Sequence, residues 1–343
     1  MQSKDTFFTR LPSLGLPALL VGCVIAFSIL LPGRFFLAST FESMAYQMPE
    51  MGLLTLAMFL PFVSAGFNLS IIVTSNLCSL LMAWTWVTYI PADAGIGLQL
   101  AWLVAGLALA CVLAVAIGTG IGSMVAYAGV HPTLTTLGVM TLIKGIGISL
   151  TGGRPIRGMP EVVQFIGNGK LLGMVPMPLV VFVLTATVTA VLLGRTQLGK
   201  NVYMAGSNIN ATYYSGVNTN RVLIAIYIYS SLMCVVAGLV MTARFNSANM
   251  GYGDSYLLLT VLAMVMGGAD PNGGFGKVWG VVLAMCVLQV ISTGLNIAGV
   301  SQHISLAMWG VVLIFSLAVR YVMKRWYMPW ALRRQAAAAI AAA

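Results

Sequence analysis

Apolar runs, each close to the length of a membrane span, recur along the whole chain and limit its possible folds more than any other feature. Hydrophobic residues make up 59% of the 343 residues and charged residues only 7%, and the mean hydropathy is +0.97. A run of about 20 apolar residues forms a helix that can cross the hydrocarbon core of a bilayer. A chain with this composition does not fold as a soluble globule. The sequence therefore predicts an all-α, polytopic membrane protein in which residues 1–343 form one transmembrane domain.

Glycine, proline and charged residues divide the apolar runs into about ten expected transmembrane helices. The first run is interpreted as an uncleaved span, because no small-residue cleavage site follows it. Five runs precede the polar passage at 195–221 and five follow it, which favours a five-plus-five inverted repeat. The alanine-rich segment 331–343 is expected to be a disordered tail. The expected spans are 14–31, 49–65, 69–90, 97–127, 134–151, 176–194, 222–243, 256–268, 278–298 and 304–323.

Lys and Arg residues lie mainly at the ends of the apolar runs and near the C-terminus. The formal net charge of +10 could indicate a nucleic-acid partner, but the charges form no single stripe, so none is expected. Cytoplasmic loops carry an excess of Lys and Arg. If both termini are cytoplasmic, most Lys and Arg residues lie on the cytoplasmic side. The reverse topology would place most of them outside. Both termini are therefore predicted to be cytoplasmic, and the spans should contact membrane lipid.

The passage Arg195–Arg221 is the longest clearly polar segment between two apolar runs, and it contains no acidic residue. Its Lys and Arg residues are typical of a cytoplasmic loop. Asn208 or Asn210 can cap a short helix through residues 211–214, and Gly216 and Asn218 can end it. Such a helix could bind another protein; an ordinary surface loop is the simpler alternative.

The same loop carries a resemblance to a known family. Residues 199–208 (GKNVYMAGSN), followed by Ala211 and residues 215–218 (SGVN), resemble the signature of ribose/xylose/arabinose-type ABC importer permeases. Weaker matches extend from about Gly66 to Val322. In that family this loop forms the coupling helix that docks into a separate ATPase subunit. The resemblance implies that the ATPase-coupling residues are Asn208, Ala211, Tyr213, Tyr214, Ser215, Gly216 and Asn218.

The resemblance also implies a function: a permease subunit of the bacterial inner membrane that passes a pentose, a related sugar or a polyol into the cytoplasm. A periplasmic binding protein would deliver the sugar, and a cytosolic ABC ATPase would use ATP and Mg, so this chain needs no cofactor. A second permease copy or a non-identical permease would complete the complex. A neutral sugar needs hydroxyl and amide partners rather than ion pairs. A secondary active transporter of a small polar solute, which needs no ATPase, is the alternative.

Motifs for catalysis or metal binding are not expected. The segment 273–277 is superficially similar to a phosphate-binding loop, but Pro271 replaces a required glycine and Val278 replaces the Ser or Thr that would bind magnesium. Residues 267–276 instead resemble a glycine-rich turn of the same permeases. The two histidines and seven acidic residues are dispersed and the five cysteines occur singly, so we expect no catalytic residue, no metal site and no enzymatic activity.

Polar residues within or beside the expected spans are candidates for the substrate path. Residues 66–70 (GFNLS) resemble the family's G-I-D-L-S motif with Asn68 in place of the acid, and Leu257 stands where a second motif has Glu. The loss of both acids favours a non-identical permease partner. Asn68 is equally open to interpretation as a helix cap, and Lys144 could reach the membrane interface instead of the path. The candidate path residues are Asn68, Ser70, Thr135, Thr136 and Lys144.

Glycines in the expected fourth span bear on helix packing. Gly118 and Gly122 are four residues apart, a spacing that permits two helices to approach closely in a membrane. The spacing could also arise by chance, because the chain contains 37 glycines.

Overall fold

Helices make up most of the structure, in agreement with the all-α prediction. The computed structural model describes residues 5–91, 94–301, 303–314 and 318. In this part of the chain, six helices are long and apolar enough to cross a membrane, namely α3, α4, α5, α7, α10 and α12. A polytopic membrane fold is therefore supported, while the count of ten spans and the inverted repeat remain predictions. The helices are α1 (Asp5–Leu30), α2 (Ala38–Val63), α3 (Ile71–Tyr89), α4 (Ile96–Ala126), α5 (Pro132–Thr151), α6 (Glu161–Asn168), α7 (Met177–Arg195), α8 (Gln197–Ser207), α9 (Ile209–Tyr214), α10 (Thr219–Phe245), α11 (Tyr256–Met266) and α12 (Val278–Ile297), followed by the short helix His303–Ile314.

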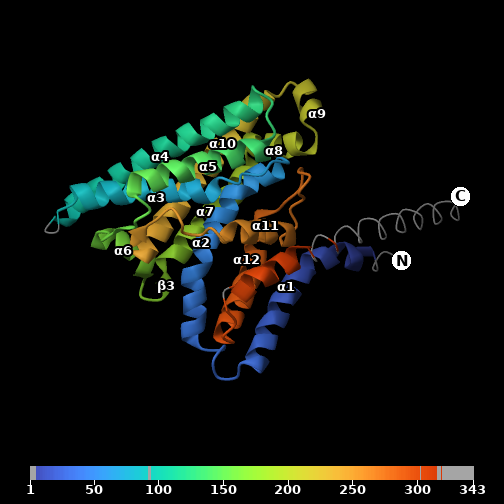
Figure 1. The fold of residues 1–343 in the computed structure, drawn as a ribbon. Helices are drawn as coiled ribbons and strands as arrows, with labels where there is room; N and C mark the ends of the chain where they lie inside the picture. The colour runs from blue at the N-terminus through green and yellow to red at the C-terminus, as the bar shows by residue number, and fades with distance from the viewer. Residues whose placement is uncertain (1–4, 92–93, 302, 315–317, 319–343) are drawn as a thin grey trace, which may run out of the picture.

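Helix α10 is the central helix of the bundle and packs against α2, α3 and α4 (Figure 1). Its contact with α4 is close because Gly118 and Gly122 face its backbone. A Cβ atom at Gly118 would lie 2.7 Å from Ile228 Cα, and one at Gly122 would lie 2.7 Å from Ile224 Cα. The packing role predicted for these two glycines is therefore confirmed.

Helix α2 is longer than predicted, since it begins at Ala38 instead of residue 49. Residues 38–48, which lie between the first two expected spans, are therefore helical and not a loop. The Ser, Thr, Glu and Gln residues among them gave this segment the polarity of a loop. In the structure Met44 packs in one apolar cluster with Phe27 of α1 and Val290 of α12, and this burial stabilises the additional helical turns.

Helix α11 is much shorter than a membrane span. It has 11 residues, about 16 Å at 1.5 Å per residue, against about 30 Å of hydrocarbon. Turns precede it, and the glycine-rich turn 267–276 follows it. Gly268, Gly273 and Gly274 all have positive φ values, between 80° and 90°, which glycine adopts without steric cost. The glycine-rich turn is therefore compact. The helix predicted over 256–268 is present as Tyr256–Met266, but it is shorter than a membrane span.

The two ends of the bundle carry different elements (Figure 1). Helices α8 and α9 lie at one end, which we call the α9 end. Helix α6 and the strands lie at the other, the α6 end. There β1 (Ile156–Arg157) pairs antiparallel with β4 (Ser247–Ala248), and β2 (Lys170–Leu171) pairs with β3 (Val175–Pro176). The predicted span 304–323 is described only to residue 314, and the predicted tail 331–343 lies outside the described residues.

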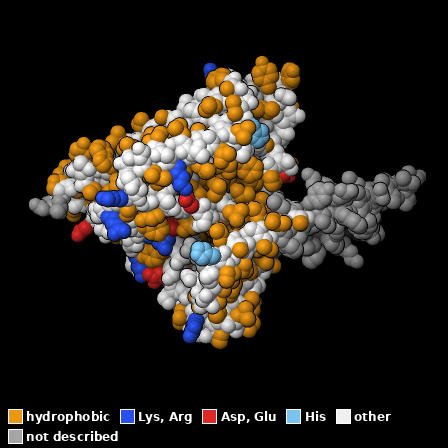
Figure 2. Space-filling view, in the orientation of Figure 1, with side chains coloured by type: hydrophobic (Ala, Val, Ile, Leu, Met, Phe, Trp, Pro, Cys, Tyr) orange, Lys and Arg blue, Asp and Glu red, His pale blue; other side chains and the backbone are white. Residues whose placement is uncertain are grey.

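Large apolar side chains remain exposed along the sides of α4, α5 and α7, for example Val112, Leu142 and Leu184. Figure 2 shows hydrophobic atoms over much of the visible surface, with Lys and Arg gathered toward the α6 end. Exposed apolar side chains in such number need an apolar environment. The surface is that of a protein whose sides contact lipid.

Candidate functional site

A pair of helices, α8 and α9, occupies the 195–221 passage, where the sequence predicted a loop with one short helix. In α8 the apolar Val202 and Ala205 are buried, whereas Lys200 is exposed. Helix α8 is a surface helix with one buried face. Its many polar residues obscured the helical spacing of the buried apolar residues in the sequence. The single-helix prediction is therefore incomplete.

The caps of α9 lie largely where the sequence placed them. Of the two candidates, Asn208 starts the helix, since its Oδ1 accepts a hydrogen bond from the backbone N–H of Ala211 at 3.0 Å. Ser215 follows the last residue, and Gly216 has a left-handed φ of 82°. Asn218 was expected to end α9 but instead starts α10, because its Oδ1 accepts from the Arg221 N–H at 3.1 Å. This expectation is corrected.

The exposed surface of α8 and α9 has the features of a protein-docking site. Tyr213 and Tyr214 are 64% and 86% exposed, and aromatic side chains of this kind are enriched at interface hot spots. Beside them, α8 and α9 enclose a hollow of about 300 Å³. We call these two tyrosines and the hollow the α8–α9 surface. The hollow is lined by Tyr203, Met204, Ser207, Asn208, Ala211, Thr212 and Ser215.

Beneath this surface, α8 packs closely against α2 and the glycine-rich turn, and these two elements also bond to each other. The Gly274 N–H, in the glycine-rich turn, donates to the Val63 carbonyl of α2 at 2.8 Å. Gly206 of α8 lies so close that a Cβ atom would overlap the Val63 carbonyl oxygen. Tyr203 Oη donates to the Gly276 carbonyl at 2.7 Å, and burial raises the pKa of Tyr203, so it remains a donor at neutral pH. A displacement of α8 would therefore move α2 and the turn between α11 and α12 directly.

Four of the five predicted path residues lie near the loop between α2 and α3 and are buried. Asn68 donates to Ser230 Oγ at 2.8 Å and accepts from the Ser70 N–H and hydroxyl. Thr136 donates to the Phe67 carbonyl at 3.1 Å, and Thr135 to that of His131 at 3.3 Å. In this conformation their polar atoms bond to the protein. The N-cap residue of α3 is Ser70, and no side chain caps this helix, so Asn68 stabilises the turn before α3 and is not its cap.

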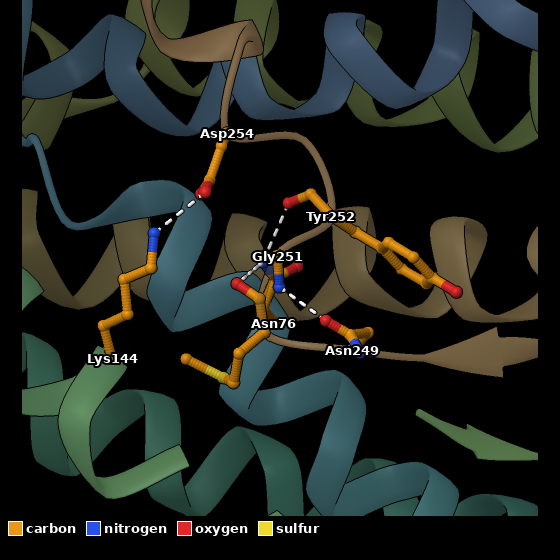
Figure 3. A network of polar contacts seen from close by, with 7 residues as sticks. Asn76, Lys144, Asn249, Gly251, Tyr252 and Asp254 are labelled. Atoms are coloured by element: carbon orange, nitrogen blue, oxygen red, sulfur yellow. Dashed lines mark hydrogen bonds and ion pairs between the residues drawn. The ribbon is translucent and has the colours of Figure 1, made fainter. Parts of the chain in front are cut away.

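Lys144, the fifth residue, lies farther along α5 and forms an ion pair with Asp254. The distance from Nζ to Oδ2 is 2.8 Å, and the side chains are 39% and 52% exposed. Figure 3 shows the two side chains pointing toward one another from α5 and the loop before α11. Asn76 of α3 fixes this loop by donating to the carbonyls of Met250 and Tyr252 at 3.0 and 2.8 Å. Lys144 thus faces a protein carboxylate at the edge of a cavity.

Three neighbouring cavities toward the α6 end form a feature that sequence analysis missed. Their volumes are about 810, 150 and 540 Å³, and Tyr256 lines all three. We call them together the polar cleft. Acidic and basic side chains balance there: Arg157 and Asp254 line the largest cavity, and Glu50 and Arg244 the smallest. The remaining polar and aromatic lining includes Gln47, Ser255, Gln289, Ser292, Asn296, His303 and Trp309.

Glu50 could have drawn attention from the sequence alone. It lies at the start of the expected span 49–65, and an ionisable residue in a span marks a candidate functional site. Its partner Arg244 lies on α10 and could not be assigned to it from the sequence. Metal binding finds no support in the described part of the chain, where no group of three or more His, Cys, Asp or Glu side chains could hold an ion. Cys78 and Cys234 are completely buried, as expected for small core residues.

Comparisons with known proteins agree with this architecture. The chain is 30% identical over 277 residues to the autoinducer 2 import system permease protein LsrD of Photorhabdus temperata, which covers 79% of this chain and 80% of that protein. The LsrD protein of Salmonella typhi is 29% identical over 323 residues, covering 90% and 91%. The ribose import permease protein RbsC of Bacillus subtilis is 32% identical over 198 residues, covering 57% and 61%. No solved structure matches the chain.

A family match covers most of the chain. Residues 40–317 match the family described as branched-chain amino acid transport system / permease component. The resemblance to importer permeases, which rested on the residues of α8 and α9, is confirmed. These residues, the apolar helices and the comparisons together show that the chain belongs to this permease family.

Proposed function

We propose that this chain is the membrane-spanning subunit of an ATP-driven importer in the bacterial inner membrane. Its substrate would be a neutral, polyhydroxylated molecule, a pentose or a related sugar or polyol. The polar cleft carries this proposal, because it combines balanced charges, amides, hydroxyls and aromatic rings in an otherwise apolar bundle. Sugar-sized sites need a few well-placed polar groups within an otherwise apolar lining.

We infer the orientation from the loop at the α9 end, because at the α6 end, where Lys and Arg also gather, Lys144, Lys170 and Arg244 are paired with acidic side chains. Arg195, Lys200 and Arg221 lie at the α9 end with no acidic residue between them, a pattern typical of the cytoplasmic side. The α8–α9 surface would then dock into a cytosolic ABC ATPase, which uses ATP and Mg. The polar cleft would open toward the periplasm, where a sugar-binding protein delivers substrate. Both termini would be cytoplasmic.

A second permease subunit is supported by the position of the polar cleft. Ser292, Asn296 and His303 line one of its cavities and remain exposed. Polar side chains at membrane depth are normally covered by protein or water. A second copy, or a non-identical permease, would cover them and complete the path. The replacements at Asn68 and Leu257 leave the choice between the two partners to measurement.

The proposed function predicts ATP-dependent uptake. The chain would be purified with a candidate ABC ATPase and a candidate secreted binding protein from the same bacterium, and reconstituted in proteoliposomes. We expect radiolabelled D-ribose or ribitol to accumulate only when all components and ATP are present. Uptake by the chain alone, driven by a proton gradient, would instead identify a secondary active transporter.

The ion pair at the edge of the cleft gives a second prediction. Lys144→Leu should reduce uptake several-fold, because it leaves Asp254 unpaired beside the largest cavity, whereas Lys144→Arg should remain close to wild type. The effect on stability should be small, about 0.2–1 kcal/mol, because exposed ion pairs contribute little. Lys170 pairs with Glu42 at 2.7 Å with similar exposure outside the cleft, so Lys170→Leu is the matched control. Full uptake by Lys144→Leu would exclude a role in the path.

A further inference from the structure

A buried ion pair and a tyrosine link three helices beside the smallest cavity of the polar cleft. Glu50 of α2 is 1% exposed, and its Oε1 lies 2.6 Å from Nη1 of Arg244, in the last turn of α10. Tyr256, the first residue of α11, donates its hydroxyl to the other carboxylate oxygen at 3.3 Å. The Arg244 side chain is 20% exposed. Both charges are thus largely removed from bulk water.

Stability alone does not account for this pair. Removing two charges from water is costly, and a buried ion pair is often no more stable than apolar side chains of the same volume. The cost applies here in a bundle where apolar residues dominate every neighbouring helix. Ionisable residues in such positions usually face a solute pathway.

The location of the pair supports the same conclusion. Glu50 and Arg244 line the smallest of the three cavities, and Tyr256 lines all three. The ion pair therefore borders the cleft, where a bound solute could reach both side chains.

The surrounding groups indicate what kind of solute fits. The Glu50 carboxylate is a strong acceptor and the Arg244 guanidinium a strong donor, while their charges cancel, so a charged solute would leave one of them without its partner. Gln289 donates to Gln47 Oε1 at 3.3 Å, and this pair of amides adds further donors and acceptors. The Trp309 ring supplies an apolar surface for the C–H face of a sugar. Each feature matches a neutral molecule rich in hydroxyl groups.

We propose that Glu50, Arg244 and Tyr256 form a hydroxyl-binding subsite that selects neutral polyols in the transport path. The proposal rests on the proposed function and adds the residues that recognise substrate. A hydroxyl of the solute donates to the Glu50 carboxylate and another accepts from Arg244, so the two side chains exchange part of their mutual bonding for bonds to the solute. No proton is transferred and no covalent bond changes.

The test compares variants in the complete reconstituted transporter, with radiolabelled D-ribose and ribitol as neutral probes and D-ribonate as the charged one. Glu50→Gln keeps the shape but removes the charged acceptor, and uptake at low substrate concentration should fall about 10- to 100-fold. The amount of copurified ATPase should be unchanged, which would show that the complex still assembles. Glu42→Gln, in the exposed pair with Lys170, is the matched control and should transport as wild type.

A double exchange separates recognition from structure. Glu50→Arg combined with Arg244→Glu restores an ion pair but reverses the positions of donor and acceptor. We expect this variant to assemble and to remain at least about 10-fold impaired in ribose uptake, because a positioned hydrogen bond to a charged group has been lost. Recovery of wild-type uptake would show that the pair is only structural, as would normal uptake by Glu50→Gln. Failure of the wild-type complex to take up either neutral probe would instead reject the proposed function.

Discussion

Ala211→Trp is expected to separate ATP hydrolysis from transport while leaving the transmembrane helices intact. Ala211 lines the hollow between α8 and α9, and its small side chain leaves room there for a group of the ATPase. An indole ring would occupy part of the hollow and block access to it. Loss of one interface hot spot costs about 2 kcal/mol or more, so ATPase binding should weaken at least about 30-fold.

The measurements are the amount of ATPase that copurifies with the permease and the number of solute molecules taken up per ATP hydrolysed. Gln197→Trp is the matched control, because Gln197 is exposed at the start of α8 and does not line the hollow. It should bind the ATPase normally. A normal ratio of uptake to hydrolysis in Ala211→Trp would place the docking site elsewhere on the α9 end.

Gly118→Leu should prevent the bundle from folding stably. A Cβ atom at this position would lie 2.7 Å from both Ile228 Cα and the Tyr227 carbonyl oxygen, and backbone atoms cannot rotate away as a side chain can. Overpacking a core costs about 1–3 kcal/mol, and occasionally more, and the backbone contacts here place the cost at the upper end. Gly122→Leu should have a similar effect, because it meets Ile224 in the same way.

Gly120→Leu is the matched control for both variants. Gly120 lies on the same helix between the two positions and is exposed, and a Cβ atom added to it would have no neighbouring atom within 4 Å. This variant should give as much folded protein as the wild type. The measurement is the yield of monodisperse protein in detergent and its thermal unfolding midpoint. Equal behaviour of Gly118→Leu and Gly120→Leu would contradict the close α4–α10 contact.

Local features of the sequence predicted most of the architecture and one of the two functional regions. Long apolar runs indicated the membrane helices, because a helix in a bilayer must satisfy its own backbone hydrogen bonds. Asn208 and Gly216 mark the ends of α9, because capping depends on residues within a few positions of each other. Helix α8 was missed, since only one of its faces is buried.

Tertiary structure decided what distant residues do together. Glu50 and Arg244 belong to different helices, and Lys144 of α5 meets Asp254 in the loop before α11. These pairings depend on how α2, α5, α10 and that loop pack against one another. No pattern within a short stretch of sequence indicates this packing. The sequence by itself determined a membrane permease and the position of the short helix α9. The packing of those helices decided where the polar cleft lies and which charges meet in it, because a charge can enter an apolar bundle only where another element brings its partner.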